Sequence, residues 1–119
     1  MVRQRITFAP ITRDAFAKWL KTESLLFPPS TGVLYSNLAF DLLSIALSEA
    51  AKEPYPDLLK KHVTGPLGMD DTTFVLSDAQ KMRFMQGHGF DGKPLRNVPT
   101  GDVIVGSGGL YSTPKDLLR

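Results

Sequence analysis

A tyrosine and an asparagine two residues apart, Tyr35 and Asn37, are the side chains best placed for chemistry in this 119-residue chain. In extended backbone, residues i and i+2 point to the same side, so this phenol and this amide can face one substrate. The phenol can exchange a proton, and the amide can hold a polar group. The structural alternative is that Ser36 or Asn37 only caps the following helix while Tyr35 packs beside it. The spacing alone favours that alternative.

The glycine-rich segment at residues 106–109, Gly-Ser-Gly-Gly, is a second candidate, because its backbone amides could bind an anion. It lacks the Lys-Ser/Thr of a P-loop and does not fit the G-x-G-x-x-G pattern. We therefore favour a tight loop that requires a positive φ.

Metal and thiol chemistry are not expected. The chain has no cysteine, which excludes a disulfide framework, a thiolate metal site and a cysteine nucleophile. His62 and His88 lie far apart in the sequence, and neither has a carboxylate at helical ligand spacing. We expect no cofactor and no metal.

Composition and charge indicate an ordinary globular protein of one domain at most. The chain is 42% hydrophobic, and 14 basic against 12 acidic residues give a net charge of +2. No basic run is longer than Lys60-Lys61, so nucleic acid is not an expected partner. The longest apolar stretch, residues 38–51, is too short to cross a bilayer, and no signal peptide is visible.

Capping and proline signals predict the helices that position these residues. Thr12 is an N-cap type, and Ile11 before it can pack on Phe16 as a hydrophobic staple. The sequence stops about one turn into its last predicted helix, which suggests a missing C-terminal part. The predicted helices begin at Thr12, cover residues 37–52 and 56–63, run from Ser77 to about Met85, and begin again at Thr113.

The predicted helix at residues 37–52 is apolar on most of its surface. Asp41, Ser44 and Ser48 form a narrow polar stripe, and the rest is mainly Leu, Ile, Phe and Ala. A helix of this kind normally lies at the centre of a larger body. We expect the remaining residues to be too few to bury it, which leaves an exposed apolar surface.

A turn signal at Asp91-Gly92 predicts a two-residue connection between two short strands. The elements together predict a mainly α fold with one small β-hairpin.

Four segments, in this order, carry a resemblance to a known family: residues 35–43, 65–74, 87–92 and 108–116. Over residues 10–119 the chain resembles the serine β-lactamase-related family. This family comprises class C β-lactamases, penicillin-binding-protein relatives and esterases, and the chain looks most like the DD-carboxypeptidase/endopeptidase branch. The resemblance implies that residues 1–119 are a single partial domain, the central helical segment of the α/β serine β-lactamase/transpeptidase-like fold.

The chemistry of this family uses three motifs: Ser-x-x-Lys, Tyr-x-Asn and Lys/His-Thr/Ser-Gly. Only the second is found here, and the resemblance makes Tyr35 the catalytic general acid/base and Asn37 the substrate-binding amide. Residues 112–115 match the letters Ser-x-x-Lys, but they follow Tyr-x-Asn instead of preceding it, so we interpret the match as chance.

The leading hypothesis is therefore a part of a serine hydrolase that acts on D-alanyl peptides or β-lactams, inactive alone. Its implied partners are a peptidoglycan peptide or β-lactam and the remainder of the enzyme, and its implied location is periplasmic or exported. One alternative is a stand-alone, non-catalytic helical module that binds a peptide or a protein. Another is an esterase that uses Ser112 and Lys115.

Overall fold

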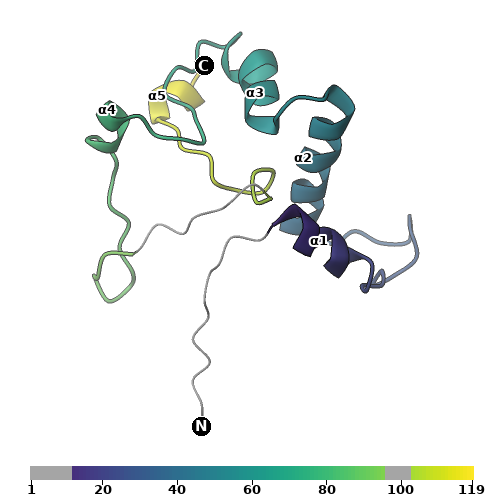
Figure 1. Ribbon diagram of the computed structural model, residues 1–119. Helices are drawn as coiled ribbons and strands as arrows, with labels where there is room; N and C mark the ends of the chain where they lie inside the picture. Colours follow the sequence, from purple (N-terminus) through teal and green to yellow (C-terminus); the bar gives the residue numbers. More distant parts are fainter. Residues whose placement is uncertain (1–11, 96–102) are drawn as a thin grey trace.

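Helices and their connecting loops make up the part of the chain that the structure describes, residues 12–95 and 103–119 (Figure 1). This computed structural model contains no β-strand within those residues. The elements are α1 (Arg13–Leu20), α2 (Asn37–Ala51), α3 (Tyr55–Leu59), the π-helix η1 (Lys60–Thr64), α4 (Asp78–Lys81) and α5 (Pro114–Leu117). The prediction of a mainly helical chain is confirmed. None of these helices is long and apolar enough to cross a membrane.

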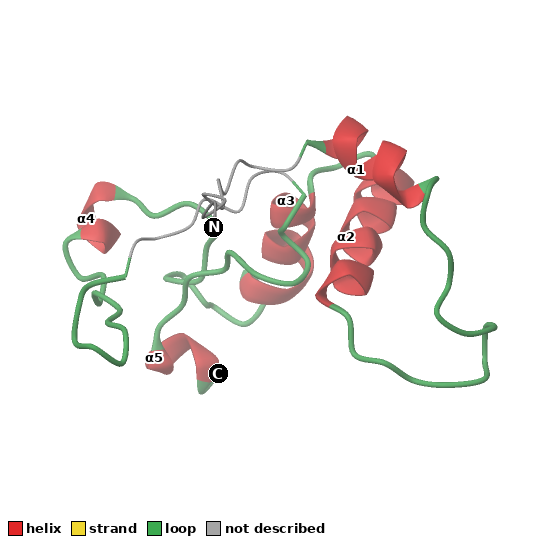
Figure 2. Ribbon diagram, turned by 90° about the horizontal axis from the view of Figure 1, so that it is seen from below, coloured by secondary structure: helices red, strands yellow, loops and turns green. Residues whose placement is uncertain are grey.

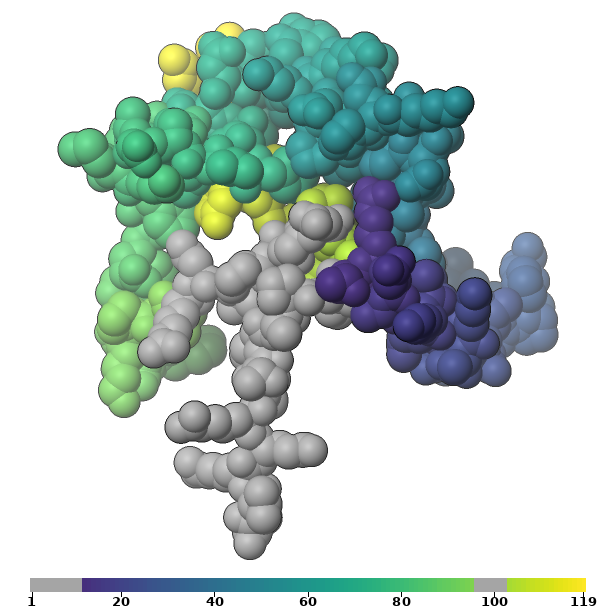
Figure 3. All heavy atoms as spheres, viewed as in Figure 1, coloured from purple at the N-terminus to yellow at the C-terminus, as the bar shows by residue number. Residues whose placement is uncertain are grey.

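The helices spread from α1 and α2 at one side of the described chain to α4 at the other. Figure 2 shows α1, α2 and α3 side by side, with α4 at the opposite end. In the space-filling view, α4 and the residues that follow it extend away from the body that α1 and α2 form (Figure 3).

Side-chain caps set the helix starts that the sequence predicted. The Oγ atoms of Thr12 and Ser36 each accept a hydrogen bond of 3.3 Å from the backbone N–H three residues later. Ser77 and Gln80 form a complete capping box at the start of α4. The predicted staple at Ile11 lies outside the described residues. These bonds satisfy backbone donors that the first helical turn leaves unpaired.

Two predicted helix ends differ from the structure. Helix α4 ends at Lys81, one turn before the predicted end at Met85. The helix expected at residues 56–63 is α3, which widens into η1. The Gly65 N–H donates to the Lys60 carbonyl oxygen five residues earlier, at 2.8 Å. A Cβ at Gly65 would lie 2.6 Å from that oxygen, so the wide turn requires glycine.

The predicted β-hairpin was wrong in its strands and in its connection. Residues 87–95 do turn back on themselves, but they form one isolated antiparallel bridge, between His88 and Pro94. Gly92 has φ of +74°, and Gly89 donates to the Lys93 carbonyl at 2.9 Å, so the connection has three residues instead of two. Pro94 has no N–H to donate, which removes one bond from a ladder.

Polar groups dominate the interior of the described residues. Phe16 and Val103 are the buried hydrophobic residues there, whereas the buried polar residues are Asp41, Ser44, Ser48, Thr64 and Asp116. The polar stripe of α2 therefore faces inward, and its other side is open. Seven exposed residues make up this side, which we call the α2 apolar arc: Ala39, Phe40, Leu42, Leu43, Ala46, Leu47 and Ala50. The expected exposed apolar surface is confirmed.

A buried carboxylate, Asp116, joins α5 to the middle of the chain. One of its oxygens, Oδ2, accepts hydrogen bonds from the Asp71 backbone N–H at 2.8 Å and from Thr72 Oγ1 at 2.9 Å. Next to this contact, Thr73 and Tyr111 exchange a pair of backbone hydrogen bonds. Segments about 40 residues apart in sequence are thus held by hydrogen bonds where little apolar packing is available.

The Asp71 side chain makes an ion pair of its own, in which Arg83 donates at 2.7 Å to Oδ1 and Gln80 donates at 3.1 Å. The Arg83 guanidinium, with a further contribution from Gln80, holds the pKa of the Asp71 carboxyl below its usual range.

Because the pKa of Asp71 is lowered in the folded chain, we expect this ion pair to stabilise the fold at pH values above about 4. The contribution is lost as the pH falls through the folded-state pKa. Asp71→Asn and Arg83→Gln should each flatten the acid limb of a plot of urea midpoint against pH. An unchanged acid limb in both variants would contradict this role.

Candidate functional site

Tyr35 and Asn37 flank the start of α2, and their side chains are open to solvent. The Tyr35 side chain is 76% exposed, and its ring centroid lies 5.7 Å from that of Phe40. Asn37 is the first residue of α2 and is also exposed. Ser36 between them is extended, with φ of −144° and ψ of 117°, as the same-side argument requires.

The alternative interpretation, in which Ser36 or Asn37 caps the helix, is confirmed for Ser36. Ser36 is the N-cap, because its side chain accepts the Ala39 N–H. Asn37 occupies the next position, so capping does not need its amide. The cap thus fixes the backbone between the two candidate residues and leaves both side chains on the surface.

A buried aspartate holds the segment 103–109 against the first turns of α2. Asp41 is 5% exposed, and its Oδ1 accepts the Ser107 backbone N–H at 2.9 Å. Its Oδ2 accepts the Ser107 hydroxyl at 3.0 Å. The carboxylate is therefore hydrogen-bonded on both oxygens, as a buried charge requires. We call these two bonds the Asp41–Ser107 clamp.

The loop at residues 106–109 combines both interpretations of its sequence. Gly109 has φ of +82°, as expected for a tight loop. The loop also presents an amide to an anion, but that anion is the chain's own Asp41 carboxylate. Gly106 allows the close approach, because a Cβ there would overlap the Phe40 carbonyl oxygen. Because Asp41 is one helical turn after Asn37, its bonds to Ser107 hold this loop one turn beyond Asn37.

Ser112 and the two histidines, which the sequence analysis also considered, lie outside this arrangement of Tyr35, Asn37 and Asp41. The Ser112 hydroxyl lies 2.8 Å from Thr72 Oγ1, so Ser112 contacts the middle of the chain and not the part of the loop that Asp41 holds. The described residues contain no cluster of three or more side chains suited to hold a metal ion, and His62 and His88 belong to none.

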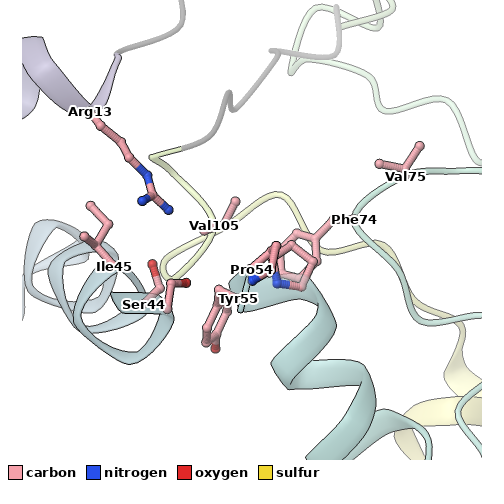
Figure 4. A pocket seen from close by; sticks show the side chains of 10 residues that line it. Arg13, Ser44, Ile45, Pro54, Tyr55, Phe74, Val75 and Val105 are labelled. Carbon is pink, nitrogen blue, oxygen red and sulfur yellow. The ribbon is translucent and has the colours of Figure 1, made fainter. Parts of the chain in front are cut away.

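A cavity of about 390 Å³ lies between α1, α2 and α3 (Figure 4). Arg13 points toward it from α1, and Ser44 and Ile45 line it from α2. The Ser48 hydroxyl, also in its lining, is buried and has no hydrogen-bond partner among the residues that the structure describes. Sequence analysis found the polar stripe of Ser44 and Ser48 but did not predict that it faces a cavity. The stripe was the sequence signal that could have indicated this cavity, because polar residues on one side of an otherwise apolar helix have different surroundings from the other sides.

Comparisons with known proteins show which family this chain belongs to. The β-lactamase family profile matches residues 3–119, almost the whole sequence. The chain therefore belongs to the β-lactamase family. Its structure superposes on a solved β-lactamase/D-alanine carboxypeptidase from Yersinia pestis with a TM-score of 0.76 and 40% identity, over 99% of this chain and 32% of that one.

Two further relatives support the same assignment. The D-alanyl-D-alanine-carboxypeptidase/endopeptidase AmpH of Escherichia coli K12 is 42% identical over 115 residues, which are 97% of this chain and 29% of AmpH. The D-alanine carboxypeptidase AmpC of Burkholderia cenocepacia matches with a TM-score of 0.80 and 26% identity, over 92% of this chain and 32% of that one. The chain thus spans about a third of the length of these relatives.

We expect Gly106→Ala to lower the stability of the chain by about 1–3 kcal/mol, because the added methyl group must displace the backbone of α2. Gly108→Ala is the matched control, since a Cβ there meets nothing within 4 Å. Urea unfolding followed by far-UV circular dichroism measures both. Equal midpoints for the two variants would show that the loop does not press on α2.

Asp41→Ala should destabilise the chain by about 1–3 kcal/mol, because it leaves the partly buried Ser107 N–H without its partner. Asp41→Asn keeps an oxygen for that N–H, and the Ser107 hydroxyl can turn to accept from the new amide. We therefore expect a smaller loss for Asp41→Asn in the same urea experiment. The opposite order would contradict the hydrogen-bonding role of this carboxylate.

Proposed function

We propose that this chain supplies one wall of the acyl-transfer site of a serine hydrolase that acts on D-alanyl peptides or β-lactams. Tyr35 serves as the general acid/base, and Asn37 binds the substrate. The observation that carries the proposal is the exposed Tyr35 and Asn37 pair at the start of α2, inside the region that matches the family. The names of the Yersinia and Escherichia relatives support the substrate class.

In the proposed reaction, a serine hydroxyl from outside this chain attacks the substrate carbonyl. Tyr35 Oη takes the serine proton as the new ester bond forms and gives a proton to the leaving amine as the C–N bond breaks. Asn37 Nδ2 donates a hydrogen bond to an amide carbonyl of the substrate, which holds it in line for attack. Water then hydrolyses the acyl-enzyme, and the serine is regenerated.

The chain alone is proposed to be inactive, because its sequence has no Ser-x-x-Lys motif before Tyr35 and Asn37 to supply the nucleophile. The Ser107 hydroxyl donates a hydrogen bond to the Asp41 carboxylate, and the Ser112 hydroxyl shares a hydrogen bond with Thr72. A peptidoglycan peptide as substrate implies a periplasmic or exported enzyme. The match of residues 3–119 to the β-lactamase family profile supports this proposal over the alternative of a self-contained binding module.

A chimera tests this function directly. We would replace the segment of Escherichia coli AmpH that aligns with this chain by residues 1–119 and measure the release of D-alanine from a D-alanyl-D-alanine peptide. The chimera should be active, whereas the isolated chain should not. Tyr35→Phe in the chimera should lower kcat by about 10²–10⁴-fold, because the reaction loses its proton carrier.

Tyr55→Phe is the matched control, because it removes the same hydroxyl from α3, where the ring packs edge-on against Phe74. We expect near-normal kcat for this variant. Asn37→Ala should mainly raise KM, since it removes a substrate contact. A folded chimera that keeps its activity with Tyr35→Phe would refute the proposed role of Tyr35.

A further inference from the structure

The cavity between α1, α2 and α3 contains a buried hydroxyl group that the proposed function does not use. Ser48 is 6% exposed and lines this cavity, and its Oγ has no hydrogen-bond partner among the residues that the structure describes. A buried polar group without a partner destabilises a fold. Ser44, one turn earlier, is satisfied, because its hydroxyl donates to the Asp41 carbonyl oxygen at 2.7 Å. The unpaired hydroxyl of Ser48 therefore marks a position where a ligand could supply the partner.

A guanidinium group lies beside the turn of α2 that carries this hydroxyl. Arg13 points toward the cavity from α1 (Figure 4), and its Nη1 donates to Glu49 Oε1 at 2.9 Å. Because Glu49 is the next residue after Ser48, this bond holds the guanidinium close to the same turn. The bond uses one of the five N–H donors of an arginine, which leaves donors for a further acceptor. The cavity thus has a cation and a hydroxyl on one side.

The remaining lining of the cavity is mainly apolar. It includes Ile45, Pro54, Phe74, Val75 and Val105 (Figure 4). The volume of about 390 Å³ is enough for a small organic molecule. An apolar cavity with a few converging polar groups is typical of a site for a small molecule that has a hydrocarbon body and one polar end.

We propose that this cavity binds a small carboxylic acid with an apolar body, at a site separate from Tyr35 and Asn37. The ligand carboxylate accepts hydrogen bonds from the Arg13 guanidinium and the Ser48 hydroxyl, and its hydrocarbon body packs against Phe74. Two donor groups match the two oxygens of a carboxylate, whereas a phosphate would bury additional unpaired oxygens and charge. Ser48 is 11 positions after Asn37 in α2, which is about 16 Å along a helix axis, so binding there is independent of the proposed reaction.

Glu49 sets the strength of this site. Its carboxylate already accepts from Arg13, but its side chain is 71% exposed, and exposed ion pairs of this kind contribute little free energy. A ligand carboxylate can therefore share the guanidinium, although the negative charge of Glu49 opposes it. Removal of that charge should strengthen ligand binding, which a purely structural role of Arg13 would not predict.

The test titrates the isotope-labelled chain with benzoate and follows the backbone amides of Ser48 and Val105 by NMR. Benzamide is the uncharged probe of the same shape. Benzoate should shift both amides in a saturable way, and benzamide should bind about tenfold more weakly, because it lacks the charge. Arg13→Gln should weaken benzoate binding about tenfold, and Glu49→Gln should strengthen it.

Ser48→Ala separates a binding role from a structural one. It should weaken benzoate binding about two- to tenfold, yet keep or raise the melting temperature of the free chain, because it removes a buried hydroxyl without a partner. Ser44→Ala is the matched control, and it should leave the benzoate affinity nearly unchanged, since its hydroxyl already donates within α2.

Three outcomes would overturn the proposal. One is the absence of any benzoate-dependent shift at the Ser48 and Val105 amides, which would mean that water alone fills the cavity. Another is a benzoate affinity that neither Arg13→Gln nor Ser48→Ala changes. The third is tighter binding of inorganic phosphate than of benzoate at the same amides, which would contradict the assignment of the ligand as an apolar carboxylate.

Discussion

The Asp41–Ser107 clamp is the interaction on which the rest of the arrangement depends. A carboxylate on a largely apolar helix is expensive to bury, and here both its oxygens are satisfied by a single residue 66 positions away. The clamp fixes which side of α2 faces inward. Once the polar stripe faces the loop at residues 106–109, the apolar arc faces outward, and the helix start with Tyr35 and Asn37 is presented at the surface.

A second buried carboxylate works in the same way at the other end of the chain. Asp116 ties α5 to residues 71 and 72 through two hydrogen bonds, as Asp41 ties its loop to α2. With Phe16 and Val103 as the buried hydrophobic residues of the described part, hydrogen bonds carry the long-range contacts. Such bonds are directional, so they specify an arrangement even where they add modest net stability. This combination suits a body that gains its main apolar packing from a partner.

Capping residues in the sequence predicted where the helices begin, because a helix start depends on a side chain within the same turn. Thr12, Ser36 and Thr113 each accept from a backbone N–H three residues later, as their types and positions indicated. The wide turn of η1 and the three-residue connection at Gly92 depend on backbone geometry that these signals do not specify. The Asp41–Ser107 clamp could not be predicted, because it joins residues whose separation in sequence carries no periodic pattern. The Tyr35 and Asn37 pair was found through its motif, and its roles remain proposals.

Amide hydrogen exchange at Ser107 in the isolated chain tests the central claim most directly. If the clamp fixes the orientation of α2, the Ser107 N–H opens together with the helix and is protected to the same degree as the amides in the middle of α2. Asp41→Ala then removes the protection at Ser107. A Ser107 amide that exchanges at the unprotected rate while α2 stays protected would contradict the account, because the helix would then hold its place without the clamp.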